Sequence, residues 1–307
     1  MRLILPLPGN ETFAARLAEA GGWKIGSIES RRFPDGESYV RILSDIDSGS
    51  VDLVCTLAHP DDSFLRLAFS ADAARSLGAR EVTLIAPYLS YMRQDRRFKS
   101  GEGLSSKTFA RLLSSIFDRL ITVDPHLHRY PALSALYTMP TNTLHAAPLL
   151  ADWIAAEIQK PLVIGPDEES EQWVSAIAAR VGAPYTVLNK IRHGDRSVDV
   201  ALPDLSPWRG CQPVLVDDIA SSGGTLIEAA RRIPLQGFPR PACVVVHGIF
   251  ADESYQRLQA LAERVVSTDS VPHESNAIGL ASLVANSIIS SSAASETFVR
   301  HRRQSEQ

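Results

Sequence analysis

Residues Val214–Thr225 read VLVDDIASSGGT, and this stretch decides the fold. Its apolar start predicts a buried strand at Val214–Val216, which ends in two acidic residues. A turn of small residues follows, and the sequence after it predicts a helix that continues to about Ile233. A buried strand joined by a glycine-rich turn to a helix is the building unit of doubly wound α/β sheets.

The small residues of the turn are Ser221, Ser222, Gly223, Gly224 and Thr225. Such a turn exposes main-chain N–H groups at a helix N-terminus, where unpaired donors and the helix dipole favour a phosphate group.

The two acids, Asp217 and Asp218, come shortly before this turn, with Ile219 and Ala220 between them and Ser221. Carboxylates at the end of a strand can accept hydrogen bonds from neighbouring sugar hydroxyls, so the stretch predicts a site for a ribose ring with its 5-phosphate. The alternative is a simple turn that caps a helix.

Short β-prone runs alternate with helical patterns on both sides of this stretch, which predicts an α/β protein with two doubly wound parallel sheets. We expect two domains, at residues 1–145 and 146–307, because one hydrophobic core rarely serves 307 residues. Before Asn142 the expected elements are strands at Val51–Leu57, Val82–Ala86 and Leu120–Val123 and helices at Phe64–Leu77 and Ser105–Phe117, with Ser105 as N-cap. After it they are helices at Ala147–Glu157, Gln172–Val181 and Tyr255–Leu261 and strands at Leu162–Gly165, Thr186–Leu188 and Val244–Gly248.

A weak internal repeat is present: Ala74–Ala79 resembles Ala178–Ala183, and each segment precedes an expected strand. It indicates two related domains, although a helix that ends in glycine before a strand is also common by chance.

The composition excludes several classes of protein. A formal net charge of -4, with 45% hydrophobic and 21% charged residues, is typical of a soluble protein and argues against general nucleic-acid binding. The apolar start Leu3–Leu5 is broken by Pro6, so it predicts neither a signal peptide nor a membrane span. Three widely spaced cysteines suit reduced thiols, so we expect a cytoplasmic protein.

Further candidate residues follow other expected strands. Asp167 comes after Leu162–Gly165 and offers oxygen ligands that suit Mg²⁺, although an acid before a helix is more often a cap. The basic segment Tyr91–Lys99, with Arg93 and Gln94, predicts a phosphate or nucleotide clamp, or else a solvated surface loop. His126 follows a third expected strand, where a lone histidine is more often structural.

Lys190 and Arg192 lead into the polar segment His193–Ser197. Such a segment can close over a phosphoryl group and bring positive charge to the transition state. The alternative, a hairpin with exposed bases, is slightly favoured on local sequence alone.

Taken in order, these motifs resemble ribose-phosphate pyrophosphokinases, and most closely the archaeal-type branch. The resemblance spans nearly the whole chain and rests on RFPDGE at Arg32–Glu37, on Pro87-Tyr88 with Arg93-Gln94-Asp95, on Asp124 with His126, on Pro166-Asp167, on Lys190 with Arg192, and on the Val214–Thr225 stretch.

The resemblance implies two phosphoribosyltransferase-type domains that convert ATP and ribose 5-phosphate to AMP and 5-phosphoribosyl 1-pyrophosphate with Mg²⁺. It implies that the motif Phe33, Asp35, Gly36 and Glu37 meets the adenine of ATP at a neighbouring subunit, so the protein would be a homo-oligomer. The remaining roles it implies are ATP phosphate binding by Arg93 and Gln94, metal binding by His126 and Asp167, catalysis by Lys190 with Arg192, and ribose 5-phosphate binding by Arg192, Asp217, Asp218 and Ser221–Thr225.

Two positions depart from the family pattern. Ser221 stands where many members carry an acid, and Glu168-Glu169-Ser170 replace the usual small residues after Pro-Asp. These departures leave a non-catalytic regulatory paralogue as one rival. The other rival is a phosphoribosyltransferase, which would use the same ribose-phosphate loop but consume the pyrophosphorylated sugar with a base.

Overall fold

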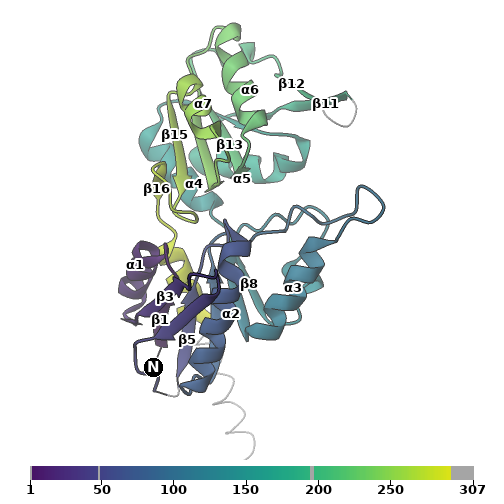
Figure 1. Cartoon of the computed structure of the whole chain (residues 1–307). Helices are drawn as coiled ribbons and strands as arrows, with labels where there is room; N and C mark the ends of the chain where they lie inside the picture. Colours follow the sequence, from purple (N-terminus) through teal and green to yellow (C-terminus); the bar gives the residue numbers. More distant parts are fainter. Residues whose placement is uncertain (1, 48, 194–196, 292–307) are drawn as a thin grey trace, which may run out of the picture. The chain divides into compact units, whose positions relative to one another are not determined.

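The computed structural model describes residues 2–47, 49–193 and 197–291, and the side chains of residues 190–200 lie outside this description. The chain divides into two compact units (Figure 1). The first unit contains residues 1–144 and 280–307, and the second contains residues 145–279. The expected change of domain near residue 145 coincides with this division, but the segment after residue 279 groups with the first unit rather than the second.

The first unit, within its described residues, is built on a six-stranded parallel sheet with the strand order β2-β1-β5-β6-β7-β8. Helices and an antiparallel strand pair, β3-β4, connect the strands of this sheet and complete the unit. The elements are β1 (Arg2–Pro6), α1 (Glu11–Gly21), β2 (Lys24–Ile25), β3 (Ile28–Arg32), β4 (Ser38–Ile42), β5 (Ser50–Val54), α2 (Pro60–Ser76), β6 (Glu81–Ala86), α3 (Ser105–Ile116), β7 (Arg119–Val123) and β8 (Thr141–Leu144).

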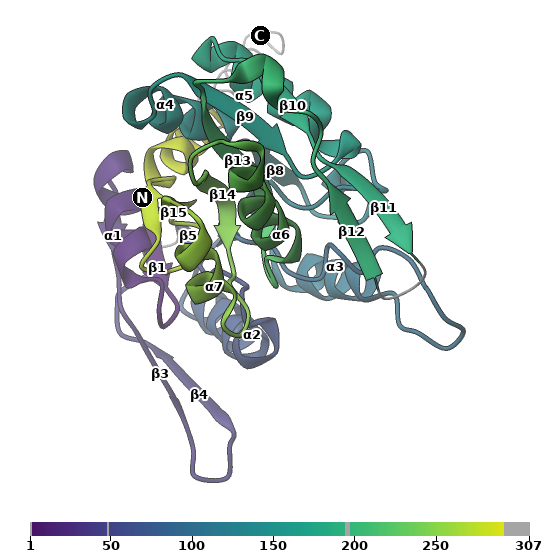
Figure 2. The ribbon, with the colours of Figure 1, turned by 90° about the horizontal axis from the view of Figure 1, so that it is seen from above.

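The second unit, over its described residues, has a six-stranded parallel sheet with the order β10-β9-β13-β14-β15-β16. Helices α4 and α5 cover one face of the sheet, and α6 and α7 cover the other (Figure 2). The elements are α4 (Ala147–Glu157), β9 (Pro161–Gly165), α5 (Glu171–Val181), β10 (Tyr185–Val187), β11 (Asn189–His193), β12 (Ser197–Ala201), β13 (Gln212–Ala220), α6 (Gly224–Arg232), β14 (Ala242–Gly248), α7 (Ser254–Leu261), β15 (Arg264–Thr268) and β16 (Asn276–Ile278).

The two units repeat one topology. In each, the first two strands are adjacent, an antiparallel hairpin follows the second strand, and the third strand then pairs with the first. The hairpins are β3-β4 and β11-β12. The chain therefore contains two related domains, as the weak repeat indicated. The two repeat segments, however, are not at equivalent positions in the two domains. Ala74–Ala79 closes the crossover from β5 to β6, whereas Ala178–Ala183 closes the crossover from β9 to β10, so the two segments occupy different places in the topology.

The central strands are buried because helices cover both faces of each sheet, which explains their continuous apolar sequences. Leu53, Leu84 and Leu120 of the first unit are fully buried, as are Leu162 and Val244 of the second. Among the described residues, no helix combines the length and apolar character that crossing a membrane requires.

Several details differ from the sequence-based expectations. The helix expected at Ser105 does begin there, but its N-cap is Leu104, and Ser105 is the first helical residue. Strand β13 does not stop at Val216, because its pairing with β14 continues through Ala220. Finally, residues 281–291 form an unpredicted helix, and its Ser287 accepts a hydrogen bond from Asn142 of β8 at 3.3 Å, which ties this C-terminal segment to the first unit.

Candidate active site

The turn after β13 has the geometry expected of an anion site. Gly223 adopts a left-handed conformation with φ 66°, which places it before the first turn of α6. The helical hydrogen bonds begin where the N–H of Ile227 donates to the Gly223 carbonyl at 2.8 Å. The N–H groups of Gly224, Thr225 and Leu226 precede this first bond, so they are donors that the helix itself does not use.

Space for a ligand exists at this turn. A Cβ atom added to Gly224 would meet no heavy atom within 4 Å, whereas one added to Gly223 would meet the Ile227 side chain at 3.4 Å. Ser222 and Gly224 are exposed, and the residues between and beside them are half-buried. Gly224 therefore leaves the approach to the start of α6 open.

Asp217 and Asp218 lie inside β13 rather than after it, and both are half-buried. The physical reason is tertiary: parallel pairing with β14 extends the strand through two residues with low β-propensity. One Asp217 carboxylate oxygen accepts a hydrogen bond from the Asp218 N–H at 2.9 Å, which orients that side chain. Successive residues of a strand face opposite sides, so the two carboxylates are not equivalent.

The loop with Asp167 lies beside this turn, because β9 pairs directly with β13 and parallel strands end at the same edge. Asp167 caps the short 3₁₀ helix η2 (Glu168–Ser170): its carboxylate accepts from the Ser170 N–H at 3.1 Å. Asp167 is therefore a helix cap, which was the alternative interpretation of its sequence position. A carboxylate has two oxygens, so a cap does not prevent it from also binding a cation. Glu168 and Glu169 are exposed.

The oxygen donors of this edge suit a hard cation such as Mg²⁺. Within the described residues, however, no three His, Cys, Asp or Glu side chains gather into a metal site. Magnesium commonly binds through one or two carboxylates together with substrate phosphates and water, so the residues present fit a cation that arrives with its nucleotide.

Lys190 and Arg192 are located on β11, which pairs with β12 as an antiparallel hairpin. Their backbone is described, but their side chains lie outside the described part of the chain, as do residues 194–196 of the segment expected to close over a phosphoryl group. The described backbone on both sides of residues 194–196 thus forms the hairpin that was the alternative interpretation.

In the first unit, the structure brings the segments that carry Arg93 and His126 together. Arg93 and Gln94 are exposed on the loop after β6, and His126 is half-buried on the loop after the neighbouring strand β7. Asp95 joins the two loops: its carboxylate lies 3.4 Å from the Arg129 guanidinium, and its carbonyl accepts from the Tyr130 hydroxyl at 3.4 Å. The Asp95 side chain is only 6% exposed, so this contact holds the first part of the basic segment Tyr91–Lys99 against the loop after β7.

The rest of the cationic loop has internal structure. A Glu102 oxygen accepts from the N–H groups of Phe98 at 2.6 Å and Lys99 at 3.0 Å, and the hydrogen bonds from Lys99 and then Phe98 lower the pKa of this carboxyl. The Arg96 guanidinium lies 4.4 Å from the Phe98 ring. The loop is therefore more than a solvated run of charges.

Phe33, Asp35, Gly36 and Glu37 form the tip of the β3-β4 hairpin, which projects as a narrow ribbon (Figure 2). The Phe33 N–H donates to the Glu37 carbonyl at 2.8 Å, and Gly36 has φ 95°, a conformation that favours glycine. Phe33 is 37% exposed, and the Arg31 guanidinium lies 4.6 Å from its ring. The tip thus presents an aromatic ring and two carboxylates.

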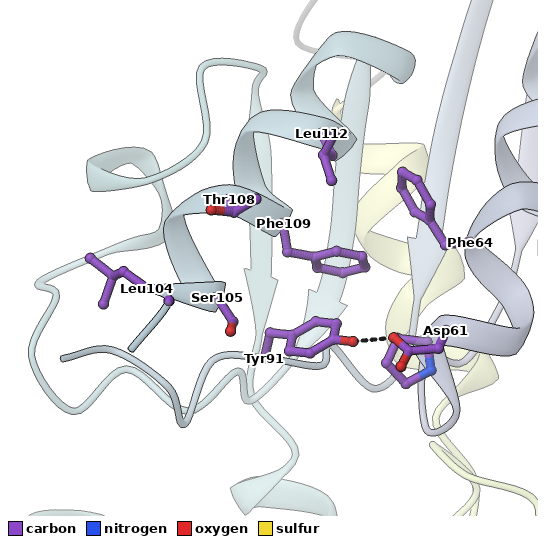
Figure 3. A pocket seen from close by; sticks show the side chains of 10 residues that line it. Asp61, Phe64, Tyr91, Leu104, Ser105, Thr108, Phe109 and Leu112 are labelled. Atoms are coloured by element: carbon purple, nitrogen blue, oxygen red, sulfur yellow. Dashed lines mark hydrogen bonds between the residues drawn. The ribbon is translucent and has the colours of Figure 1, made fainter. Parts of the chain in front are cut away.

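A cavity of about 520 Å³ beside the cationic loop was missed by sequence reasoning (Figure 3). Phe64, Phe109 and Leu112 supply apolar walls, and the Tyr91 hydroxyl donates to Asp61. This hydrogen bond, followed by burial, raises the pKa of Tyr91 to about 12. The lining residues come from the starts of two helices and from one loop, and no local pattern links them.

Each unit has the parallel α/β arrangement of phosphoribosyltransferase domains, and the second carries a glycine turn at the start of α6. Two family models match: residues 3–116 match the N-terminal domain of ribose phosphate pyrophosphokinase, and residues 134–282 match the phosphoribosyl transferase domain. A solved phosphoribosylpyrophosphate synthetase from Mycobacterium smegmatis, 22% identical, aligns with a TM-score of 0.83 over 95% of this chain and 99% of its own, which supports the fold.

Curated relatives are more similar in sequence. The ribose-phosphate pyrophosphokinase of Methanopyrus kandleri is 35% identical over 290 residues, which cover 93% of this chain and 98% of that protein. The protein of the same name from Methanothermobacter thermautotrophicus is 31% identical over 287 residues, which cover 92% of this chain and 99% of the relative. The chain belongs to the ribose-phosphate pyrophosphokinase family, in agreement with the resemblance read from its motifs.

Proposed function

We propose that the chain transfers the diphosphate group of Mg-ATP to the C1 hydroxyl of ribose 5-phosphate, which gives 5-phosphoribosyl 1-pyrophosphate and AMP. The C1 oxygen attacks the β-phosphorus, the bond between the β-phosphorus and the oxygen bridging to the α-phosphate breaks, AMP leaves, and the hydroxyl proton is released. The observation that carries the proposal is the turn 221–225 at the start of α6, which begins three residues after Asp218 at the end of β13. Family membership makes the chain an enzyme of this class.

In the second unit, the N–H groups at the start of α6 would hold the 5-phosphate. Of Asp217 and Asp218, the carboxylate on the ligand's side of the strand would accept hydrogen bonds from the ribose hydroxyls. Lys190 and Arg192 would neutralise charge on the transferred group, because phosphoryl transfer depends mainly on positioning and electrostatics. In the first unit, Arg93 and Gln94 would bind the ATP phosphates. Asp167 in the second unit and His126 in the first would each be able to hold Mg²⁺, which would supply positive charge to the phosphates when bound.

The deciding experiment is to incubate the purified protein with ribose 5-phosphate, ATP and Mg²⁺ and to separate the nucleotide products. We expect one AMP per 5-phosphoribosyl 1-pyrophosphate formed, and no reaction when a chelator removes the metal. Formation of ADP would indicate ordinary kinase chemistry, and no turnover at all would favour the regulatory paralogue. A phosphoribosyltransferase would instead require the pyrophosphorylated sugar and a base as substrates. The match of residues 3–116 to a pyrophosphokinase-specific domain supports the proposed reaction over that rival.

Replacing Gly224 with alanine should weaken ribose 5-phosphate binding without harm to the fold. The added methyl group meets no protein atom within 4 Å, and alanine favours a helix over glycine by about 0.5–1 kcal/mol. A phosphate seated at the start of α6 would meet that methyl group, and such overpacking costs about 1–3 kcal/mol, so we expect an affinity about ten- to a hundredfold lower by titration calorimetry.

The matched control is Gly103→Ala, because Gly103 also has no heavy atom within 4 Å of an added Cβ and lies in the first unit. It should leave the affinity for ribose 5-phosphate unchanged. Equal affinity of Gly224→Ala and the unaltered chain would remove the turn from the site.

We also propose that the protein is a homo-oligomer in which the Phe33–Glu37 tip meets the ATP of a neighbouring subunit. The exposed aromatic ring at this tip supports the proposal, as does an apolar strip on α2, where Leu65 is 54% and Phe69 is 46% exposed one turn apart. Activity per chain should fall on dilution, in step with dissociation followed by sedimentation velocity. Constant specific activity of a monomer would contradict the proposal.

A further inference from the structure

The turn 221–223 is braced from behind by the segment that follows β14. The Ala220 carbonyl accepts hydrogen bonds from the N–H groups of Ile249 at 3.0 Å and Phe250 at 2.9 Å. The Ser221 carbonyl accepts from the Ala251 N–H at 3.1 Å and from the Ser254 hydroxyl at 3.0 Å. The Ala220 carbonyl at the end of β13 and the Ser221 carbonyl of the turn are thus each held by two donors from residues 249–254.

This bracing determines where the amides of the turn point. A trans peptide is planar, and its C=O and N–H point in opposite directions. The described chain contains no cis peptide bond, so a Ser221 carbonyl held toward Ala251 and Ser254 turns the Ser222 N–H the other way. Ser222 is exposed, whereas Ser254 is 3% exposed. The Ser222 N–H is therefore aimed at the open side of the turn, where the start of α6 also has its unused donors.

The brace is itself rigid. Phe250 and Asp252 adopt left-handed backbone conformations, with φ 45° and 53°, which non-glycine residues keep only when their surroundings enforce them. The Phe250 ring lies 5.1 Å from Tyr255 and 4.7 Å from His273, measured between ring centroids, and Tyr255 and His273 are 4.5 Å apart. Three mutually packed rings thus anchor the segment that holds the turn.

We propose that Ser254 is a positioning residue for the phosphate of ribose 5-phosphate: through the Ser221 carbonyl, its hydroxyl fixes the orientation of the Ser222 N–H. This inference rests on the proposed function of the turn and adds a residue that never touches the ligand. Ser254 lies 33 residues along the chain from Ser221. A polar residue at the start of α7 gives no local sign of such a role.

The test compares Ser254→Ala with Ser254→Thr, which retains the hydroxyl. Because one hydrogen bond that orients a donor is lost, we expect the dissociation constant and the KM for ribose 5-phosphate to rise about fivefold to tenfold in Ser254→Ala. The KM for ATP should stay unchanged, the melting temperature should fall by only a few degrees, as the loss of one hydrogen bond predicts, and Ser254→Thr should restore most of the affinity. Ser175→Ala is the control, since it also loses one bond from a serine hydroxyl to a main-chain carbonyl, that of Gln172 at 2.9 Å, on helix α5 away from the turn.

The outcomes separate the two levels of the argument. If the unaltered chain binds ribose 5-phosphate and Ser254→Ala binds it equally well, the positioning role is wrong while the proposed function stands. A lower melting temperature with equal increases in both KM values would also overturn it, because a general packing role predicts that pattern. If the unaltered chain binds no ribose 5-phosphate, the proposed function falls, and the positioning role falls with it.

Discussion

Lys190→Ala should lower kcat about 10²–10³-fold while ribose 5-phosphate still binds. Removing one group that stabilises transition-state charge typically costs this much, whereas ground-state binding of the sugar phosphate depends on the turn at the start of α6. The experiment therefore pairs steady-state kinetics with titration of ribose 5-phosphate into the variant. We expect an unchanged dissociation constant for the sugar phosphate alongside the large loss of turnover.

Lys160→Ala provides the control. Lys160 is exposed just before β9, at the opposite edge of the same sheet from the candidate site, and its removal changes the net charge by the same amount. It should retain normal turnover. An unchanged kcat in Lys190→Ala would remove the catalytic role of Lys190, and a parallel loss of sugar phosphate affinity would show that the residue acts in binding instead.

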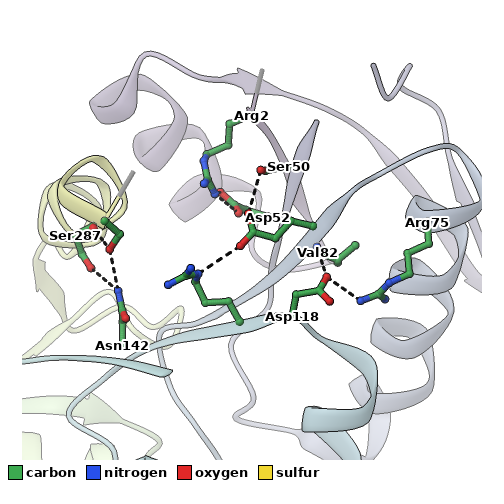
Figure 4. Close-up of polar contacts among 11 residues, drawn as sticks. Arg2, Ser50, Asp52, Arg75, Val82, Asp118, Asn142 and Ser287 are labelled. Atoms are coloured by element: carbon green, nitrogen blue, oxygen red, sulfur yellow. Dashed lines mark hydrogen bonds and ion pairs between the residues drawn. The ribbon is translucent and has the colours of Figure 1, made fainter. Parts of the chain in front are cut away.

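Arg2→Met should destabilise the protein by about 3–5 kcal/mol, because it leaves a buried carboxylate without its cation. Two oxygens of Asp52 lie 2.5 and 2.7 Å from one guanidinium nitrogen of Arg2, and the Asp52 side chain is fully buried (Figure 4). Burial raises the pKa of Asp52, and Arg2 opposes this rise. Without Arg2 the pKa would rise further, so protonation would neutralise the buried group.

The effect should depend on pH in a defined direction. A carboxyl whose pKa is higher in the folded than in the unfolded state binds more protons when folded, so folding stability falls as pH increases between the two pKa values. The loss in Arg2→Met should therefore be larger at neutral than at acidic pH, as measured by urea unfolding. The double variant Arg2→Met/Asp52→Leu should recover most of the stability, because a buried ion pair can often be replaced by apolar groups.

Arg75→Met is the comparison, since Arg75 makes an ion pair of 2.9 Å with Asp118 in which both side chains are about 40% exposed, at 39% and 44%. Exposed pairs contribute about 0–1 kcal/mol. A loss in Arg2→Met no larger than in Arg75→Met would show that the buried pair is not a major source of stability.

The sequence identified the elements whose signals are local. The strand, the turn and the helix around Asp217 were predicted because an apolar run, two acids and two glycines occur within a few residues of one another. The predicted end of β13 was wrong, since the last four residues of this strand depend on pairing with β14. The strands of the β3-β4 hairpin were not predicted, because their charged sequences, such as IESRR, show no apolar run.

The candidate site also divides into residues that the local sequence predicts and contacts that depend on the tertiary fold. Residues at strand ends, such as Asp167 and His126, could be proposed from sequence, because a residue after a parallel strand lies at the binding edge of the sheet. Which loops are neighbours depends on strand order, so the contact of Asp95 with Arg129 could not be foreseen. Ser254 was missed for the same reason.

The repeated topology of the two units has a consequence for binding stoichiometry. In the second unit, β13 leads to the proposed phosphate-binding turn, and the corresponding strand of the first unit is β5. After β5 the chain reads CTLAHP, without a glycine, and Cys55 and Leu57 there are buried. If the proposed site is correct, a molecule formed by doubling one domain has kept the glycine turn in only one of its two described units, so each chain should bind one ribose 5-phosphate.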